Sequence, residues 1–82
     1  MSQMKYLRYE EAGIVLFEPH ISHKVMHEVF NSSMDTLLSA GTTTVWAVDD
    51  ELQVRASGGS ITLNINSLPD DDEMIKRRLC LY

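Results

Sequence analysis

Two short apolar stretches near the start of the chain predict a β-hairpin. Residues 4–10 and 14–17 are rich in aliphatic and aromatic side chains, which favour strands. Between them, Glu11-Ala12-Gly13 fits a three-residue hairpin loop whose glycine takes the left-handed conformation. This loop sets a register with two apolar pairs on one face, Tyr9 with Val15 and Leu7 with Phe17.

An amphipathic helix is predicted over residues 23–38. Pro19 ends the preceding strand because proline cannot donate a ladder hydrogen bond, and Ser22 is a suitable N-cap. Ser39-Ala40-Gly41 predicts the end of the helix, with Gly41 as its left-handed cap residue. The apolar residues of this stretch fall on one helical stripe: Met26, Val29, Phe30, Met34 and Leu37.

Three further strands are predicted at residues 42–48, 52–57 and 60–65, which are β-branched or alternate between apolar and polar. Asp49-Asp50-Glu51 is the first turn between them, and Gly58-Gly59 fits a two-residue hairpin turn. The second turn aligns three apolar pairs: Ala56 with Ile61, Val54 with Leu63 and Leu52 with Ile65. A one-residue shift would remove all three pairs, so the pattern indicates this register.

The last predicted helix begins at Ser67, which forms a capping box with Asp70. Acidic residues follow near its start and basic residues near its end, as the helix dipole favours. The predicted fold is a single α+β domain over residues 1–82. It has a mainly antiparallel sheet with two helices on one face, in the order β-β-α-β-β-β-α.

Composition and charge narrow the possible functions. The 82 residues carry a formal charge of −5, which argues against unspecific nucleic-acid binding because that depends on excess Lys and Arg. The single Cys cannot form an internal disulfide, so a cytoplasmic location is expected. No apolar run approaches the ~18 residues of a membrane span, so we expect no membrane association.

Three histidines have a spacing that metal sites can use. On a helix, His23 and His27 face the same way, and His20 lies just before them. A structural zinc site normally needs four ligands, and no Cys lies nearby. We therefore expect histidines at the edge of the core, with no bound metal or cofactor. A small metal-dependent protein or enzyme that uses His20, His23 and His27 is the alternative.

Two acidic runs contain seven of the twelve acidic residues: Asp49, Asp50 and Glu51, and Asp70, Asp71, Asp72 and Glu73. One interpretation is a surface that contacts a basic partner by imitating nucleic-acid phosphates. The other is a polar turn and a helix start, where negative charge is favourable. Calcium loops alternate their acids around a glycine, and neither run does.

The second face of the first hairpin is a candidate contact surface. It contains four residues in a more apolar mixture than a solvent-facing strand needs: Tyr6, Arg8, Ile14 and Leu16. Tyr and Arg are favoured anchors in interfaces. With both helices assigned to the inner face, this outer face needs a further cover, and we expect a homodimer in which each hairpin meets its copy. Trp46, in contrast, is expected in the core beside Val54.

Residues 59–63 and 67–71, together with Ile21-Ser22-His23 and Ser39-Ala40-Gly41, resemble a group of small uncharacterised phage and prophage proteins. These share a short N-terminal hairpin and similar helix entry and exit signals. The resemblance implies a mobile-element origin and no enzyme activity. Small acidic phage proteins often bind a host protein, for instance as inhibitors of CRISPR or restriction systems.

The sequence therefore favours a non-enzymatic protein that binds and modulates a host protein, with no catalytic residues. A transcriptional regulator is the remaining alternative. Its phosphate contacts would be Lys76, Arg77 and Arg78, which is a small set beside the roughly 6–10 contacts of strong DNA-binding proteins.

Overall fold

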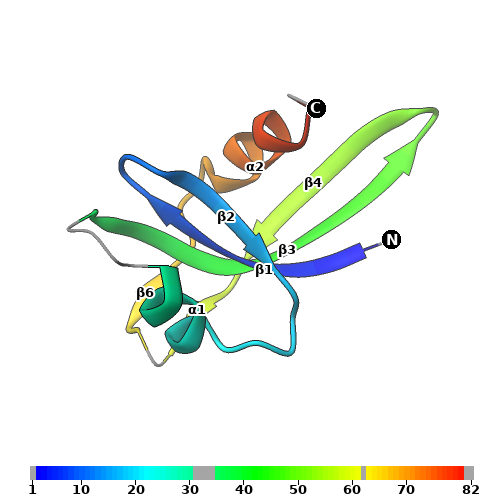
Figure 1. Cartoon of the computed structure of the whole chain (residues 1–82). Helices are drawn as coiled ribbons and strands as arrows, with labels where there is room; N and C mark the ends of the chain where they lie inside the picture. Colours follow the sequence, from blue (N-terminus) through cyan, green and yellow to red (C-terminus); the bar gives the residue numbers. More distant parts are fainter. Residues whose placement is uncertain (1, 31–34, 62, 81–82) are drawn as a thin grey trace.

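The computed structural model describes residues 2–30, 35–61 and 63–80 (Figure 1). Its main sheet is antiparallel and has the strand order β2-β1-β3-β4. The strands are β1 (Ser2–Tyr9), β2 (Gly13–Phe17), β3 (Leu37–Val48) and β4 (Glu51–Ser57). A small ribbon contains β5 (Gly59–Ser60) and β6 (Ile65–Asn66), and the helices are α1 (His23–Phe30) and α2 (Asp71–Cys80). The predicted α+β class with a mainly antiparallel sheet is confirmed.

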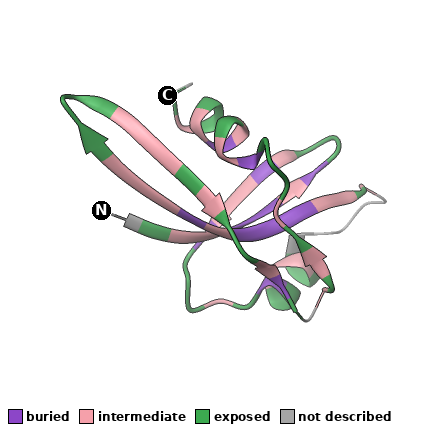
Figure 2. Ribbon diagram, turned by 180° about the vertical axis from the view of Figure 1, so that it is seen from behind, coloured by how far each residue is buried: buried purple, intermediate pink, exposed green. Residues whose placement is uncertain are grey.

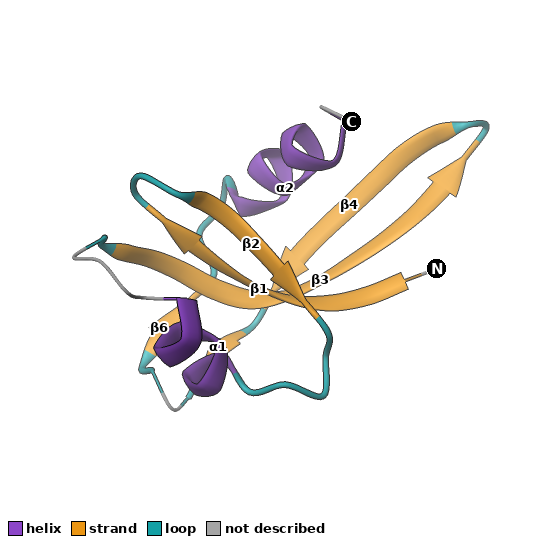
Figure 3. Ribbon diagram, in the orientation of Figure 1, coloured by secondary structure: helices purple, strands orange, loops and turns teal. Residues whose placement is uncertain are grey.

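The two helices lie on opposite faces of the main sheet, so the prediction of both on one face is wrong (Figure 3). Met26 of α1 packs against the core cluster that contains Leu7 and Tyr9. Ile75 of α2 packs in a second cluster with Tyr6. Neighbouring side chains of a strand point to opposite faces. Because β1 is a central strand with apolar residues on both sides, each face needs its own covering layer.

β1 and β2 form the predicted hairpin in a shifted register. Leu7 pairs with Val15 rather than with Phe17. Because the shift is two residues, each side chain keeps the face that the sequence predicts. Asp35 holds the turn, since its carboxylate accepts hydrogen bonds from the backbone N–H groups of residues 11 and 12 at 3.0 and 2.9 Å. This long-range contact is not visible in the loop sequence.

Helix α1 ends earlier than predicted. Its last residue is Phe30, and β3 already begins at Leu37. The predicted helix end at Ser39-Ala40-Gly41 is therefore wrong, because these residues lie inside β3. Residues 31–34, which include Met34 of the predicted stripe, lie outside the described residues.

Gly41 is not a helix cap. It lets the neighbouring strands β1 and β4 come close to β3. A Cβ atom at this position would lie 2.5 Å from the Ser57 carbonyl oxygen and 3.1 Å from the Tyr6 ring. Tyr6 is also the β1 partner of Gly41 in the ladder. Glycine is therefore required here because only a residue without Cβ leaves room for the Tyr6 ring over the strand.

Residues 59–61 and 63–66 lie outside the main sheet, so the strand predicted at 60–65 is wrong. Ser60 pairs with Ile65 inside the small ribbon, and the three predicted apolar pairs with β4 do not form. Leu63 and Ile65 instead pack against the Leu7 cluster beside α1. This packing partly removes both side chains from water, which stabilises the ribbon.

The turn between β3 and β4 contains two residues, Asp49 and Asp50, rather than three. This shorter turn moves the register by one residue, and such a shift carries a side chain to the other face. Trp46 consequently pairs with Gln53 and lies on the face opposite to Val54. The predicted core position of Trp46 beside Val54 is wrong.

Thr43 is a buried polar residue of β3 whose substitution should stabilise the fold. Its side chain is fully buried, and its hydroxyl has no hydrogen-bond partner among the described residues. A buried hydroxyl without a partner costs about 1–3 kcal/mol, so Thr43→Val should raise the free energy of unfolding by about 1 kcal/mol or more. Urea denaturation measures this change. Thr44→Val, on the other face and partly exposed, is the control, and an equal gain in both variants would contradict the explanation.

Candidate functional site

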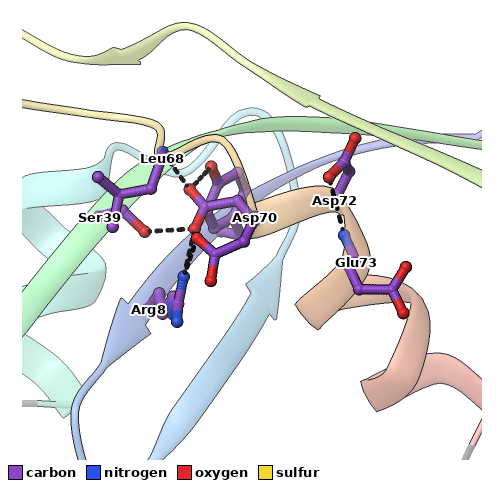
Figure 4. A network of polar contacts seen from close by, with 8 residues as sticks. Arg8, Ser39, Leu68, Asp70, Asp72 and Glu73 are labelled. Carbon is purple, nitrogen blue, oxygen red and sulfur yellow. Dashed lines mark hydrogen bonds and ion pairs between the residues drawn. The ribbon is translucent and has the colours of Figure 1, made fainter.

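The most densely connected polar group of the described chain is the buried carboxylate of Asp71, at the start of α2. Figure 4 shows this network with Arg8, Ser39 and Leu68 labelled. The Asp71 carboxylate accepts hydrogen bonds from the hydroxyl of Tyr6 and from the hydroxyl of Ser39, the latter at 2.9 Å. The Arg8 guanidinium donates a third bond at 2.9 Å, and the Leu68 backbone N–H donates a fourth at 2.8 Å. Asp71 thereby joins β1, β3 and the loop before α2.

Burial and neighbouring charges around Asp71 keep Tyr6 and Arg8 protonated and Asp70 ionised. Burial and the neighbouring Asp71 carboxylate raise the pKa of the Tyr6 hydroxyl well above its ordinary value. Hydrogen bonds to Asp70 and Asp71 raise the pKa of Arg8, and Arg8 in turn lowers the pKa of Asp70. Four donors occupy the acceptor positions of the Asp71 carboxylate. The group is therefore built to hold elements together rather than to receive a substrate.

The raised pKa of Tyr6 predicts a loss of stability in alkali. The unfolded chain ionises its tyrosines near pH 10, whereas the buried Tyr6 hydroxyl stays protonated. Stability is therefore complete below about pH 10 and falls above it, by about 1.4 kcal/mol per pH unit for one such group. Urea denaturation from pH 8 to 11 tests this. Tyr6→Phe should be less stable than the wild type at pH 8 but lose less stability at higher pH. An equal loss in both chains would contradict the role of Tyr6.

The contact face predicted on the first hairpin is covered by α2. Tyr6 is 0% exposed and Ile14 is 6% exposed, and both pack against Ile75. Leu16 packs against the same cluster, and Arg8 is turned toward Asp70 and Asp71. The prediction of an exposed outer face is wrong because the helices cover both faces. The homodimer was expected because this face would be exposed, and that reason no longer applies here.

The four residues of the second acidic run form ion pairs or hydrogen bonds within the molecule. Besides buried Asp71, Asp70 contacts Arg8 at 2.9 Å, and Glu73 contacts Arg77 at 3.4 Å. Asp72 accepts the backbone N–H of Glu73 at 2.9 Å. The capping pair also differs from the prediction. The Asp71 carboxylate accepts the N–H of Leu68, one residue later than the predicted pair of Ser67 and Asp70.

The three histidines are placed in separate contacts. His23 is buried and donates a ring N–H to the Gly41 carbonyl at 2.8 Å. His27 lies 2.7 Å from the Tyr9 hydroxyl and stacks on its ring, while His20 is exposed beside Glu18. Within residues 2–30, 35–61 and 63–80, no three side chains of His, Cys, Asp or Glu gather as metal ligands would.

The β3–β4 hairpin extends beyond α1, and α2 lies against one of its two faces (Figures 1 and 2). No residue from Thr44 to Ser57 is buried, and the molecule is elongated, at 40 × 23 × 21 Å. Val54 and Ala56 face α2. Trp46 and Arg55 lie on the opposite face, and Trp46 is only partly buried. Trp46 is not a member of either core cluster of the described residues.

The tip of this hairpin is acidic and conformationally unusual. Asp49, Asp50 and Glu51 are all exposed, and Glu51 lies 3.7 Å from Lys76 of α2. Asp49 and Asp50 have φ values of 51° and 66°, as a two-residue turn requires. Asn-Gly and Asp-Gly are the preferred pairs in such turns, so Asp50 places a second negative charge where glycine is the usual residue.

Sequence reasoning missed two of these features. Ser39 is a donor to Asp71, although the sequence shows it only as part of an expected helix end. Trp46 is displayed on the hairpin because the turn is one residue shorter than predicted. The position of Trp46 could have been predicted from Asp49-Asp50, because two such residues can form a hairpin turn without Glu51.

Comparison with known proteins does not assign a family, since no family model, curated protein or solved structure matches the chain. Among the described residues, no helix is long and apolar enough to cross a bilayer.

Proposed function

We propose that this protein is a non-enzymatic interaction module that binds another protein and modulates it, with the β3–β4 hairpin as its contact element. The observation that carries the proposal is the hairpin itself, which projects from the body with no buried residue between Thr44 and Ser57 (Figure 2). A fold of this size places most side chains in its core or near it. The face of this strand pair opposite to α2, which contains Trp46 and Arg55, is therefore available for contacts with a partner.

The chemistry of the hairpin fits a protein interface. Trp46 and Arg55 lie on one face, at neighbouring positions across the ladder. Trp and Arg are enriched among the residues that contribute most to binding. Their separation, one diagonal step on antiparallel strands, lets both side chains contact one pocket of a partner.

The acidic tip of the hairpin favours a partner with a basic surface. Asp49 and Asp50 are exposed at the end of the hairpin, and the chain carries a formal charge of −5. Complementary charge accelerates association and makes it sensitive to salt. With the resemblance to phage and prophage proteins, this favours a host protein with a basic nucleic-acid groove, such as a nuclease of a CRISPR or restriction system.

Capture from bacterial host lysate tests the proposal. The wild-type chain, Trp46→Ala and the control Val29→Ala are each immobilised, and the bound proteins are quantified by mass spectrometry. Val29 is 73% exposed on α1, away from the hairpin, so its variant also removes an exposed apolar side chain. We expect one protein that the wild type and Val29→Ala retain and Trp46→Ala loses by about ten-fold or more, as for an interface anchor. Equal retention by all three chains would contradict the proposal.

A further inference from the structure

A shallow cavity of about 290 Å³, widely open to solvent, lies between the start of α1, the main sheet and β5. Its lining includes five polar side chains: Lys5, Ser22, His23, Thr42 and Ser60. α1 and the ribbon lie side by side below the sheet in Figure 3. We propose that this cavity binds an oxyanion, the phosphate or carboxylate group of a small ligand.

Charge is the first argument. Lys5 lines the cavity, and no carboxylate belongs to the lining, although the chain has twelve acidic residues against seven basic ones. The Lys5 ammonium donates to the Ile21 carbonyl at 3.0 Å, which fixes its position. An ammonium group has three N–H donors, so two remain for a bound anion.

Ser22 and Thr42 add hydroxyl groups that can donate hydrogen bonds. His23 and Ser60 are only 7% and 5% exposed and form a packed wall of the cavity, since the ring N–H of His23 already donates to the Gly41 carbonyl. Thr42 is the ladder partner of Lys5 on the sheet and lines the same cavity. Ser22 accepts the N–H of Val25 at 3.2 Å, and its hydroxyl hydrogen is free to point elsewhere. Hydroxyl and ammonium donors around one cavity match the acceptor oxygens of an oxyanion.

The volume of the cavity and the dipole of helix α1 both fit an oxyanion ligand. At ~30 Å³ per water molecule the cavity holds about ten waters, which is enough for a phosphate group with part of its hydration shell. The N-terminus of α1 also opens on it, since both Ser22 and His23 line the cavity. A helix start adds a partial positive charge to donors that are already present.

Titration with inorganic phosphate and, separately, with acetate tests the proposal. Amide shifts in NMR spectra at low ionic strength should saturate for residues 22–24, 42 and 60. Lys5→Gln should weaken binding by about ten-fold or more, the effect of losing a charged hydrogen-bond donor. The control Lys24→Gln removes a neighbouring exposed charge of α1 that does not line the cavity, and its binding should stay within about two-fold, as for an exposed charge.

A second variant keeps the test decisive, because Lys5 also holds the Ile21 carbonyl. Thr42→Glu leaves that bond in place and puts a carboxylate beside Lys5, so saturable binding should disappear while the spectrum stays folded. The stronger ligand, phosphate or acetate, identifies the oxyanion. Unsaturated shifts in the wild type, or equal weakening in Lys24→Gln, would overturn the proposal. Neither result bears on the Trp46 face, which the capture experiment tests separately.

Discussion

Asp71→Ala should lower the free energy of unfolding by about 3–5 kcal/mol, the cost of removing one partner from a buried ion pair. The change leaves the hydroxyls of Tyr6 and Ser39 without their acceptor. It also leaves Arg8, which is mostly buried, with only the exposed Asp70 as its ion-pair partner among the described residues. A domain of this size has a total stability of about 4–12 kcal/mol. Urea denaturation followed by circular dichroism should show a midpoint at a much lower urea concentration than that of the wild type.

The neighbouring Asp72 provides the matched control. It stands one position later in the same acidic run, and its carboxylate accepts the backbone N–H of Glu73. Asp72→Ala should cost less than about 1 kcal/mol, as for a single hydrogen bond near the surface. If both variants lost the same stability, general charge at the helix start would explain the effect and the buried network around Asp71 would not.

Gly41→Ala should cost about 3 kcal/mol, at the upper end of the range for an overfilled core. The new Cβ atom would lie 2.5 Å from a backbone carbonyl oxygen of Ser57, and a backbone atom cannot move aside as a side-chain end can. It would also press on the Tyr6 ring at 3.1 Å and disturb the hydroxyl that donates to Asp71. The midpoint of chemical denaturation measures the loss.

Gly13→Ala separates this steric effect from backbone strain. Gly13 has a φ of 77°, but a Cβ atom there meets nothing within 4 Å. The substitution should therefore cost only the left-handed conformation, about 1 kcal/mol. A loss at Gly41 no larger than the loss at Gly13 would show that the strands have room for a side chain where Tyr6 crosses.

The sequence predicts the elements of this fold better than their ends. Alternation in the first hairpin assigns each side chain to the correct face, because a two-residue shift in register preserves that assignment. The end of α1 cannot be predicted in the same way. Ser39-Ala40-Gly41 is a plausible helix end by composition, and only the Tyr6 ring over Gly41 identifies it as part of a strand. That contact joins residues far apart in the chain.

The candidate sites depend on the same kind of long-range contact. Four consecutive acidic residues begin at Asp70, and nothing in their order distinguishes the buried Asp71 from the others. The sequence did contain one signal that both faces of the sheet are covered. Tyr6 and Leu7 are adjacent in a central strand, and both have large apolar side chains. Reading that pair as two buried faces predicts a helix on each side of the sheet, as the structure has it.

Site-specific photocrosslinking in host cells tests the proposed contact element most directly. A benzophenone amino acid replaces Gln53, which pairs with Trp46 on the same face, in one chain and Val29 in another, and both chains are irradiated and separated by mass. We expect one discrete adduct from position 53 and none from position 29, because the β3–β4 hairpin contacts the partner and the exposed side of α1 does not. An adduct at position 29 alone, or equal adducts at both positions, would contradict it.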